Sequence, residues 1–523
     1  MTTTATPSEQ PRQKGVLGWI ERTGNALPDP VFIFLWLILG LAIISAIAAA
    51  MGVQVLHPVA KDEAGAPVVV QATSLFDPAN IRKLLVDMPT TFTHFHPLGY
   101  VLVVMLGAGI AERTGLFGSA MRAAVKGAPK FLLTPMIAFV AMMGNLAADA
   151  AYVVLIPLAA VLYASAGRHP IAGIAAAFAG VSGGFSANLL PGQLDALLFG
   201  ITEAASVSLA PWEMNIAGNW YFIAAMLFIF LPVIWFVTDK IIEPRLGPWK
   251  GGVSSSIEPQ VEGSSKEGKA LAWSGLAGLV VVALWVFLTI GPGTPLIDTT
   301  KDDPVMRLTP MLQSLVAGFF VLFLVMGWVY GAVTGVVKGH RDIVKMMAQS
   351  MGDMAYYLVL AFAAAHFVAM FNWSNLGLIA AVNGADFLRS ANLPAPALLA
   401  AIVVMTAAIN LLVGSASAKW GLLAPVLVPM LMLLNISPEM ATAAYRVGDG
   451  ATNIITPLMV YFPLILTFAQ RWNPQFGLGS LTAMMLPYSI WILITGVALT
   501  VGWVALDLPL GPGATVGYTL PPQ

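Results

Sequence analysis

Residues 183–192 read Gly-Gly-Phe-Ser-Ala-Asn-Leu-Leu-Pro-Gly, and residues 448–457 read Gly-Asp-Gly-Ala-Thr-Asn-Ile-Ile-Thr-Pro. Each stretch has glycines before an asparagine, Asn188 or Asn453, and a proline shortly after it. Both stretches interrupt long apolar segments of the chain. Because glycine and proline weaken helices, the two stretches predict a broken helix at each place.

Each of these stretches follows a second polar interruption. Residues 144–149 read Gly-Asn-Leu-Ala-Ala-Asp, residues 414–419 read Gly-Ser-Ala-Ser-Ala-Lys, and an apolar run follows each. The separation is 44 positions from the first glycine to Asn188 and 39 positions from the second to Asn453. The same interruptions in the same order predict an internal repeat with one copy in each half of the chain.

The composition indicates the solvent in which these breaks lie. Of the 523 residues, 58% are hydrophobic and 10% are charged, against about 45–50% and about 25% in soluble domains. We therefore expect an all-α polytopic membrane protein. The net charge of −1 argues against a nucleic-acid partner. The absence of cysteine excludes disulfides, thiol catalysis and cysteine-ligated metals.

Several apolar segments are long enough to span a bilayer. A hydrocarbon core of ~30 Å requires about 20 apolar residues per helix. The segments that meet this length lie near 31–52, 214–238, 270–290, 311–337, 350–372 and 484–506, with a weaker one near 97–112. The stretches 131–206 and 394–470 are longer and carry the interruptions.

The distribution of lysine and arginine predicts the topology. If the helices alternate from a cytoplasmic N-terminus, 17 of the 25 basic residues fall on the cytoplasmic side and 6 on the outer side, while Lys419 and Arg446 lie inside apolar stretches. This asymmetry agrees with the positive-inside rule only if 131–167 and 394–434 each enter and leave on one side. We therefore predict nine transmembrane helices plus two re-entrant helical hairpins, with the N-terminus cytoplasmic and the C-terminus outside.

This topology divides the chain into six consecutive segments. They are a cytoplasmic N-terminal segment (1–30); scaffold helices with an outer loop and a cytoplasmic amphipathic segment (31–130); the first hairpin and broken helix (131–210); further scaffold helices with a cytoplasmic linker at 240–269 (211–393); the second hairpin and broken helix (394–470); and the last helix with the C-terminal tail (471–523). We expect 131–210 and 394–470 to form the transport domain.

Broken helices inside a membrane have a functional meaning. Irregular backbone at membrane depth survives only where it is buried in protein or lines a cavity. The exposed helix ends present N–H groups to anions and carbonyl groups to cations. Two such breaks in corresponding places predict an inverted-repeat secondary transporter with its site near the membrane midplane.

Several stretches resemble the signature sequences of the p-aminobenzoyl-glutamate transporter (AbgT) family. These stretches are Asp-Ala-Ala-Tyr-Val-Val-Leu-Ile-Pro at 149–157, Arg-His-Pro-Ile-Ala-Gly at 168–173, Val-Ser-Gly-Gly-Phe-Ser-Ala-Asn at 181–188, Gly-Ser-Ala-Ser-Ala-Lys-Trp at 414–420, and Tyr-Arg-Val-Gly-Asp at 445–449 with Thr-Asn-Ile-Ile-Thr-Pro at 452–457. The similarity extends over nearly the whole chain.

The resemblance implies a bowl-shaped homodimer in a bacterial inner membrane, with ion-coupled transport and no cofactor. The coupling ion is Na⁺ or H⁺. The implied substrates are p-aminobenzoyl-glutamate, which is taken up, and sulfonamide antimetabolites, which are exported. The functionally important residues of the family match Asp195, Asn410, Ser417, Trp420, Arg446, Asp449 and Pro457 in this chain.

The charged residues of the apolar stretches have two interpretations each. Arg446 and Asp449 share a helix face, either as a mutually neutralising pair or as a functional site, which intramembrane charge favours. Arg446 offers a planar fork for a carboxylate or sulfonyl oxygen, and Asp449 could accept a cation or proton. Asp195 is either a buried proton carrier or a solvated residue near the outer interface.

Neutral oxygens are candidates for an ion site. Asn188 and Asn453 occupy matching places, and Asn410, Ser415 and Ser417 add oxygens at the second hairpin. Asn410 and Asp449 are candidate ligands of a sodium ion. The competing interpretation for each residue is a hydrogen bond between helices, which contributes only about 0.6 kcal/mol on average in membranes.

Three further residues have open assignments. Lys419 stands in the second hairpin where the first has Asp149, and it either mimics a bound cation or pairs with Asp449. Trp420 could stack on an aminobenzoyl ring, although a tryptophan in a helix bundle is more often a packing residue.

Other function classes fit the sequence less well. The chain has no Gly-x-x-x-x-Gly-Lys-Ser/Thr phosphate loop, which argues against a primary pump. Residues 414–418 superficially resemble a nucleophile elbow, but Ala416 stands at the serine position and Ala418 at the closing glycine, so we expect no enzyme. A transporter of another small carboxylate and an uncoupled channel remain as alternatives.

Overall fold

The computed structural model covers the chain, and its described part begins at Asp29. The described residues are 29–61, 66–125, 129–147, 151–210, 212, 214–249, 266–291, 293–301, 306–456, 458–459 and 461–519. The expected N-terminal segment therefore lies almost entirely outside the described residues, as does the greater part of the linker at 240–269. Both ends of this predicted linker are helical, because helix continues to Leu246 and resumes at Glu267.

Seven helices of the described chain are long and apolar enough to cross a membrane. They are α2 (Pro30–Ala50), α11 (Trp220–Phe236) with its continuation through η4 (Val237–Ile242) and α12 (Glu243–Leu246), α13 (Glu267–Ile290), α15 (Leu315–Thr334), α17 (Ala355–Trp373), α20 (Ala416–Leu433) and α23 (Leu478–Ala505). Helices α5 (His96–Arg113) and α6 (Leu116–Val125) meet at a bend of 63° and make an eighth span if counted together. The protein is therefore an all-helical, multi-pass membrane protein.

The first half interrupts its helices twice. Helix α7 (Leu133–Met143) ends in the short turn η1 (Gly144–Ala147), and the chain returns through η2 (Ala151–Leu155) and α8 (Ile156–Ser165). Helix α9 (Pro170–Phe178) continues into η3 (Ala179–Gly183), and helix starts again only at α10 (Gln193–Ser206). The break predicted at 183–192 is confirmed.

The second half repeats this arrangement. Helix α19 (Ala395–Asn410) ends, residues 411–415 are not helical, and α20 follows. Helix α21 (Pro438–Asn453) ends at the break, and α22 (Phe462–Gln470) follows it. α21 begins at a strong start signal, because the Ser437 hydroxyl accepts a hydrogen bond from the Met440 N–H at 3.1 Å and Pro438 follows as the first helical residue.

The remaining elements are shorter than a membrane span. They are β1 (Gln54–Lys61), β2 (Pro67–Gln71), α3 (Pro78–Val86), α4 (Met88–Thr93), η6 (Met306–Leu308), α14 (Thr309–Gln313), α16 (His340–Asp353) and α18 (Leu376–Ser390). The two strands form an antiparallel hairpin in which Gln54 faces Gln71. Sequence analysis missed this hairpin and α16, whose carboxyl-terminal end it joined to the span at 350–372.

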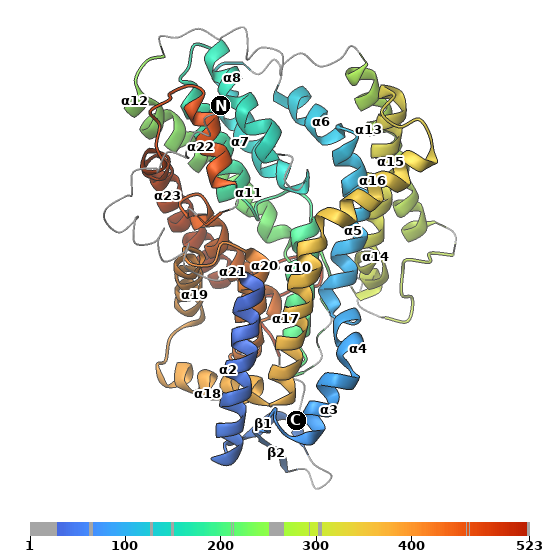
Figure 1. Cartoon of the computed structure of the whole chain (residues 1–523), viewed down its shortest axis with the longest axis vertical. Helices are drawn as coiled ribbons and strands as arrows, with labels where there is room; N and C mark the ends of the chain where they lie inside the picture. Colours follow the sequence, from blue (N-terminus) through green and yellow to red (C-terminus); the bar gives the residue numbers. More distant parts are fainter. Residues whose placement is uncertain are drawn as a thin grey trace, which may run out of the picture.

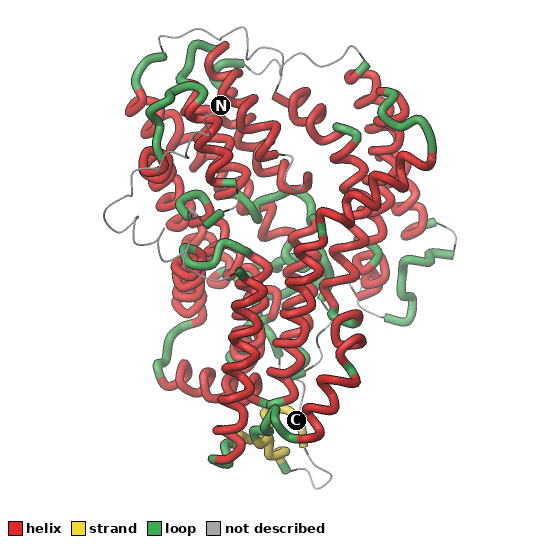
Figure 2. Tube along the Cα trace, in the orientation of Figure 1, coloured by secondary structure: helices red, strands yellow, loops and turns green. Residues whose placement is uncertain are grey.

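The elements are distributed along one long axis. In Figure 1, α6, α8 and α12 lie at one end of this axis, and α18 lies with the β1–β2 hairpin at the other. Most of the described chain is helical, and the only strands in it are the two at that end (Figure 2). The largest buried cluster includes residues of α7 to α11 and of α18 to α23, so the two interrupted regions form one core.

Candidate functional site

The site is built around α21, the first part of the second broken helix. All sixteen of its residues are buried, among them Tyr445, Arg446 and Asp449. Such burial of charge requires partners, because an ion taken out of water is costly unless it is paired. Two ion pairs provide them.

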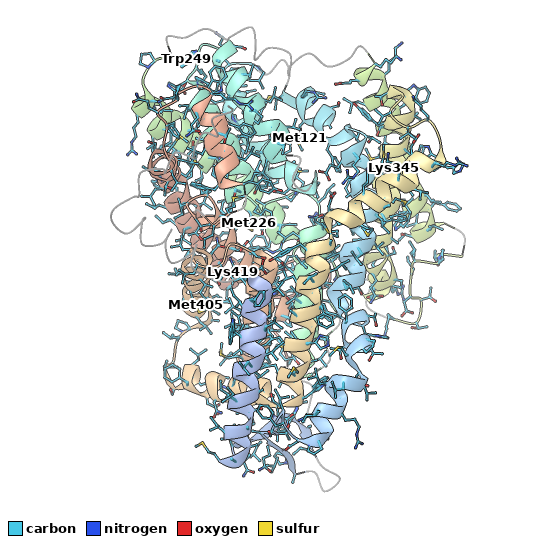
Figure 3. The ribbon with its side chains drawn as sticks, viewed as in Figure 1. Met121, Met226, Trp249, Lys345, Met405 and Lys419 are labelled. Carbon is cyan, nitrogen blue, oxygen red and sulfur yellow. The ribbon has the colours of Figure 1, made fainter. Side chains whose placement is uncertain are left out.

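The first ion pair joins α20 of the second hairpin to α21 of the second broken helix. The Lys419 ammonium of α20 lies 2.5 Å from Asp449 Oδ1, and their side chains are 0% and 2% exposed. Lys419 stands in the first turn of its helix, where the helix dipole disfavours a cation, so the carboxylate offsets an unfavourable position. Figure 3 shows Lys419 at about mid-height of the long axis. Of the two assignments for Lys419, this geometry fits pairing with Asp449.

Asn410 connects this pair to the end of the broken helix. Its Nδ2 group lies 2.8 Å from the carbonyl oxygen of Asp449, 3.0 Å from Thr452 Oγ1 and 2.9 Å from Asn453 Oδ1. Its Oδ1 accepts a hydrogen bond from Lys419. The structure thus brings together four residues that the sequence analysis selected: Asn410, Lys419, Asp449 and Asn453.

The second ion pair joins the two halves of the chain. Arg446 Nη1 donates to Asp195 Oδ1 of α10 at 2.7 Å, and the side chains are 2% and 9% exposed. Asp195 Oδ2 also accepts the Gly192 N–H at 2.7 Å, at the start of α10. Arg446 and Asp449 therefore do not neutralise each other, which was one of their two interpretations, because each has a partner on another helix. Asp195 is buried, which is inconsistent with its solvated interpretation.

Trp420 lies between these ion pairs as a buried packing residue. It has no exposed surface, and its Nε1 donates to Thr202 Oγ1 at 2.8 Å. Its ring stacks on Tyr445 with centroids 4.4 Å apart. Tyr445 therefore covers one face of the Trp420 ring.

The hairpin serines are less buried than the ion pairs. Ser415 caps α20 by accepting the Ala418 N–H at 3.3 Å, and its hydroxyl lies 3.3 Å from that of Ser417. This cap accounts for Ser415 through local structure alone.

In the first half, Asn188 lies within the break between η3 and α10. Its Nδ2 group lies 3.4 Å from the Met142 carbonyl oxygen of α7, and its own N–H donates to the Ile223 carbonyl of α11 at 3.2 Å. Asn188 thus links the break to the end of the first hairpin arm. Two selected residues, Asp149 and Pro457, lie outside the described residues.

Sequence analysis missed several contributors. Tyr445 donates its hydroxyl to the Ala416 carbonyl at 2.6 Å, and its position directly before Arg446 was the only signal. Gly450 allows the two broken helices to approach, since a Cβ there would lie 2.9 Å from the Gly183 carbonyl oxygen. Thr202 carried no signal in the sequence beyond being polar in an apolar helix.

The two residues predicted to bind sodium contact a different cation in the structure. Asn410 Oδ1 and Asp449 Oδ1 both contact the Lys419 ammonium group, so a cation of the protein's own already lies between them. Among the described residues, no cluster of three or more His, Asp or Glu side chains could hold a metal ion. The chemistry of the site fits a monovalent ion or a proton better than a transition metal.

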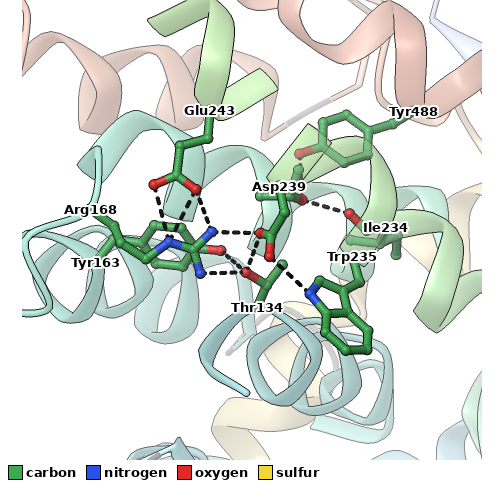
Figure 4. A network of polar contacts seen from close by, with 9 residues as sticks. Thr134, Tyr163, Arg168, Ile234, Trp235, Asp239, Glu243 and Tyr488 are labelled. Carbon is green, nitrogen blue, oxygen red and sulfur yellow. Dashed lines mark hydrogen bonds and ion pairs between the residues drawn. The ribbon is translucent and has the colours of Figure 1, made fainter. Parts of the chain in front are cut away.

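A separate polar network fixes the open end of the first hairpin (Figure 4). Arg168, in the loop after α8, pairs with Asp239 at 2.5 Å and also with Glu243. Its guanidinium also donates to Thr134 Oγ1 of α7 at 2.8 Å. The network ties both arms of the first hairpin to the cytoplasm-proximal end predicted for α11.

Comparison with known proteins found relatives that match over nearly the whole chain. The profile of the AbgT putative transporter family matches residues 15–518. A p-aminobenzoyl-glutamate transport protein of Escherichia coli (strain K12) is 35% identical over 515 residues, which are 98% of this chain and 99% of that protein.

Two solved structures have the same fold. The YdaH transporter of Alcanivorax borkumensis is 42% identical, with a TM-score of 0.86 over 93% of this chain and 100% of that one. MtrF of Neisseria gonorrhoeae, described as illuminating a class of antimetabolite efflux pumps, is also 42% identical, with a TM-score of 0.88 over 95% and 99%.

Proposed function

Because this chain belongs to the AbgT family of transporters, we propose that it is an ion-coupled secondary transporter. Its substrates are p-aminobenzoyl-glutamate-like aromatic carboxylates, sulfonamide antimetabolites, or both. The relatives support these classes, since one is named for p-aminobenzoyl-glutamate transport and another for antimetabolite efflux. As a family member the chain is a transporter and not an enzyme.

The ion pair between Arg446 and Asp195 is the observation that carries this proposal. It joins a helix of the second half to a helix of the first at 2.7 Å in the buried core. A substrate carboxylate or sulfonyl oxygen competes with Asp195 for the guanidinium, whose Nε has no hydrogen-bond partner among the described residues. Substrate binding and the contact between the two halves are thereby linked.

The helix arrangement supports alternating access. We assign nine membrane crossings to α2, α5–α6, α9–α10, α11, α13, α15, α17, α21–α22 and α23, with α7–α8 and α19–α20 as re-entrant hairpins. The hairpins enter from opposite sides, the N-terminus is cytoplasmic, and the C-terminus is outside a bacterial inner membrane. We further propose that the protein is a homodimer, as the family resemblance implies.

Two coupling ions remain candidates. A proton on Asp195 would remove its charge and release Arg446 for the substrate, whereas sodium would bind to the amide and carbonyl oxygens at the helix breaks. Both act on the same buried centre. The alternatives of a different small carboxylate substrate and of an uncoupled channel are separated by the experiment below.

Counterflow in proteoliposomes tests the proposal. Labelled p-aminobenzoyl-glutamate or a labelled sulfonamide is offered outside vesicles loaded with the unlabelled compound, and sodium and proton gradients are imposed separately. We expect transient accumulation of label and a dependence on one of the two gradients. Uptake that only equilibrates, without counterflow and without gradient dependence, would support a channel. No uptake of either compound, with uptake of another carboxylate, would correct the substrate class.

A further inference from the structure

The same hydrogen bond occurs separately at each of the two hairpin tips. Asn145 Nδ2 lies 3.4 Å from the Gly184 carbonyl oxygen, 39 positions later, and Asn410 Nδ2 lies 2.8 Å from the Asp449 carbonyl oxygen, also 39 positions later. Asn145 and Gly184 precede Asn410 and Asp449 by 265 positions each, and Asn188 precedes Asn453 by the same 265 positions. Asn145 therefore corresponds to Asn410, and the match of residues 144–149 with 414–419 drawn from the sequence is displaced by five positions.

At each tip, the carboxyl-terminal ends of two helices also lie close together. In the first half, α7 ends at Met143 and η3 ends at Gly183. The Met142 carbonyl oxygen lies 3.1 Å from Asn145 Nδ2 and 3.4 Å from Asn188 Nδ2. Helix carboxyl ends carry partial negative charge, which favours a cation where two of them meet.

In the second half, this cation is part of the protein. The Lys419 ammonium contacts Asn410 Oδ1 and Asp449 Oδ1 at the meeting point of α19 and α21. The offset that relates Asn145 to Asn410 places Val154 opposite Lys419 and Gly184 opposite Asp449. The first half has neither the ammonium group nor the carboxylate at these positions.

At the first hairpin tip, side-chain oxygens lack partners among the described residues, whereas at the second tip the Lys419 ammonium group contacts the corresponding oxygen. Within the described chain, Asn145 Oδ1 and Ser186 Oγ are both buried without a hydrogen-bond partner. Asn145 Oδ1 corresponds to the atom that receives Lys419, and Ser186 lies two residues after Gly184 in the same break. Ser186 is 4% exposed. Buried polar atoms without partners are rare, and a bound ion or water is one explanation for them.

We propose that a sodium ion binds in the first half between the hairpin tip and the helix break, with Asn145 Oδ1 and Ser186 Oγ among its ligands. The inference rests on the proposed function, for which it names the coupling ion and its place. Oxygen ligands select hard cations. Because these oxygens are neutral, the site suits a monovalent ion. Lys419 is then the fixed counterpart of this mobile cation in the other half.

Sodium-dependent thermal stability tests the site without requiring transport. Full-length protein in detergent is unfolded by heat in a series of sodium chloride concentrations, with choline chloride holding the ionic strength constant. We expect sodium to raise the melting temperature of the wild type. Ser186→Ala and Asn145→Ala should require at least about tenfold more sodium for the same rise. Asn383→Ala should respond as the wild type does, because Asn383 makes its own bond within α18, from Nδ2 to the Ile379 carbonyl at 2.9 Å.

The outcomes separate this inference from the transport proposal. Equal sodium and choline curves for the wild type would overturn the site and leave water as the partner of both oxygens, even if counterflow succeeds. Unchanged sodium dependence in Ser186→Ala, which removes only a hydroxyl and remains informative if Asn145→Ala does not fold, would overturn it as well. Conversely, a sodium response that these variants weaken would support the site even if p-aminobenzoyl-glutamate counterflow fails.

Discussion

The tips of the two hairpins make the same hydrogen bond from an asparagine to a backbone carbonyl, but they carry different charges. At the second tip, Lys419, Asp449 and Asn410 satisfy one another in a closed cluster. At the first tip, Asn145 makes the matching backbone contact, but its oxygen and that of Ser186 have no partner among the described residues. A repeated fold thus provides a permanent cation in one half and room for an exchangeable one in the other. The halves meet at Arg446 and Asp195.

The largest effect is expected where the two halves meet. Arg446→Ala leaves Asp195 buried without its cation, which should lower the free energy of unfolding by about 3–5 kcal/mol and abolish counterflow. The double variant Arg446→Gln/Asp195→Asn removes both charges at similar volume and should regain much of that stability without regaining transport. Thermal unfolding and counterflow measured on the same preparations check this. Wild-type flux in either variant would show that the ion pair is not part of the transport site.

The next largest effect concerns how each hairpin is held at its open end. Arg168 is paired with two carboxylates and is 16% exposed. At the second hairpin, Arg389 of α18 donates to the Leu433 carbonyl of α20, and its ion pair with Asp386 lies within α18, with side chains 53% and 61% exposed. We expect Arg168→Ala to cost about 2–3 kcal/mol and Arg389→Ala less than about 1 kcal/mol. Chemical denaturation of the two variants measures the difference. Equal losses would show that the hairpins are anchored alike.

A smaller effect tests the contact between the two broken helices. In Gly450→Ala, the new Cβ would lie 2.9 Å from the Gly183 carbonyl oxygen, whereas at Gly502, within α23, it would meet nothing within 4 Å. We expect Gly450→Ala to destabilise by about 1–3 kcal/mol and Gly502→Ala to be neutral or stabilising by up to about 1 kcal/mol. If both variants unfold at the wild-type temperature, the breaks are not in contact.

The smallest effect is a pH dependence confined to the first half. His169 caps α9 by accepting the Ile171 N–H at 3.3 Å, and the equivalent cap of α21 is Ser437, which does not titrate. Burial lowers the pKa of His169 below 6.5, and Glu243 opposes this shift. The folded state therefore favours the neutral ring, so its stabilisation is complete above pH 6.5 and is lost as pH falls through the lower folded value.

Hydrogen exchange in the first turns of α9 and α21 measures this difference. Below pH 6.5, we expect faster exchange at the start of α9 only, by at most about 0.5 kcal/mol because the site is partly solvated. His169→Asn retains a capping side chain and should remove the pH dependence. A similar acid effect at both helices would assign it to a group shared by the halves.

Prediction from sequence succeeded where the pattern is local. Glycine, asparagine and proline inside apolar stretches located both helix breaks, and the apolar lengths located the long spans. The β1–β2 hairpin and α16 were missed because neither has the length or hydropathy of a span. The charged residues selected around α21 lie together in the structure, and charge inside an apolar stretch is visible in the sequence; their role in transport stays a prediction.

The pairing of these residues was predicted only in part. Pairing of Lys419 with Asp449, 30 residues apart, was one of the two assignments for Lys419. The partner of Arg446 is Asp195 of α10, 251 residues away, and no spacing in the sequence indicated that pair. The role of Asn145 was also missed, because Gly144 and Gly414 gave the more conspicuous match. Only the hydrogen bonds revealed the register of the repeat.

The number of sodium ions bound per chain tests the comparison between the halves most directly. Radioactive sodium binding at equilibrium is measured for the wild type, Ser186→Ala and Lys419→Met, the last of which leaves Asp449 and Asn410 without their ammonium group. The account predicts one ion for the wild type, a site weakened beyond detection in Ser186→Ala, and two ions for Lys419→Met, with sodium taking the place of the lysine. No ion in the wild type, or one ion in all three proteins, would contradict it.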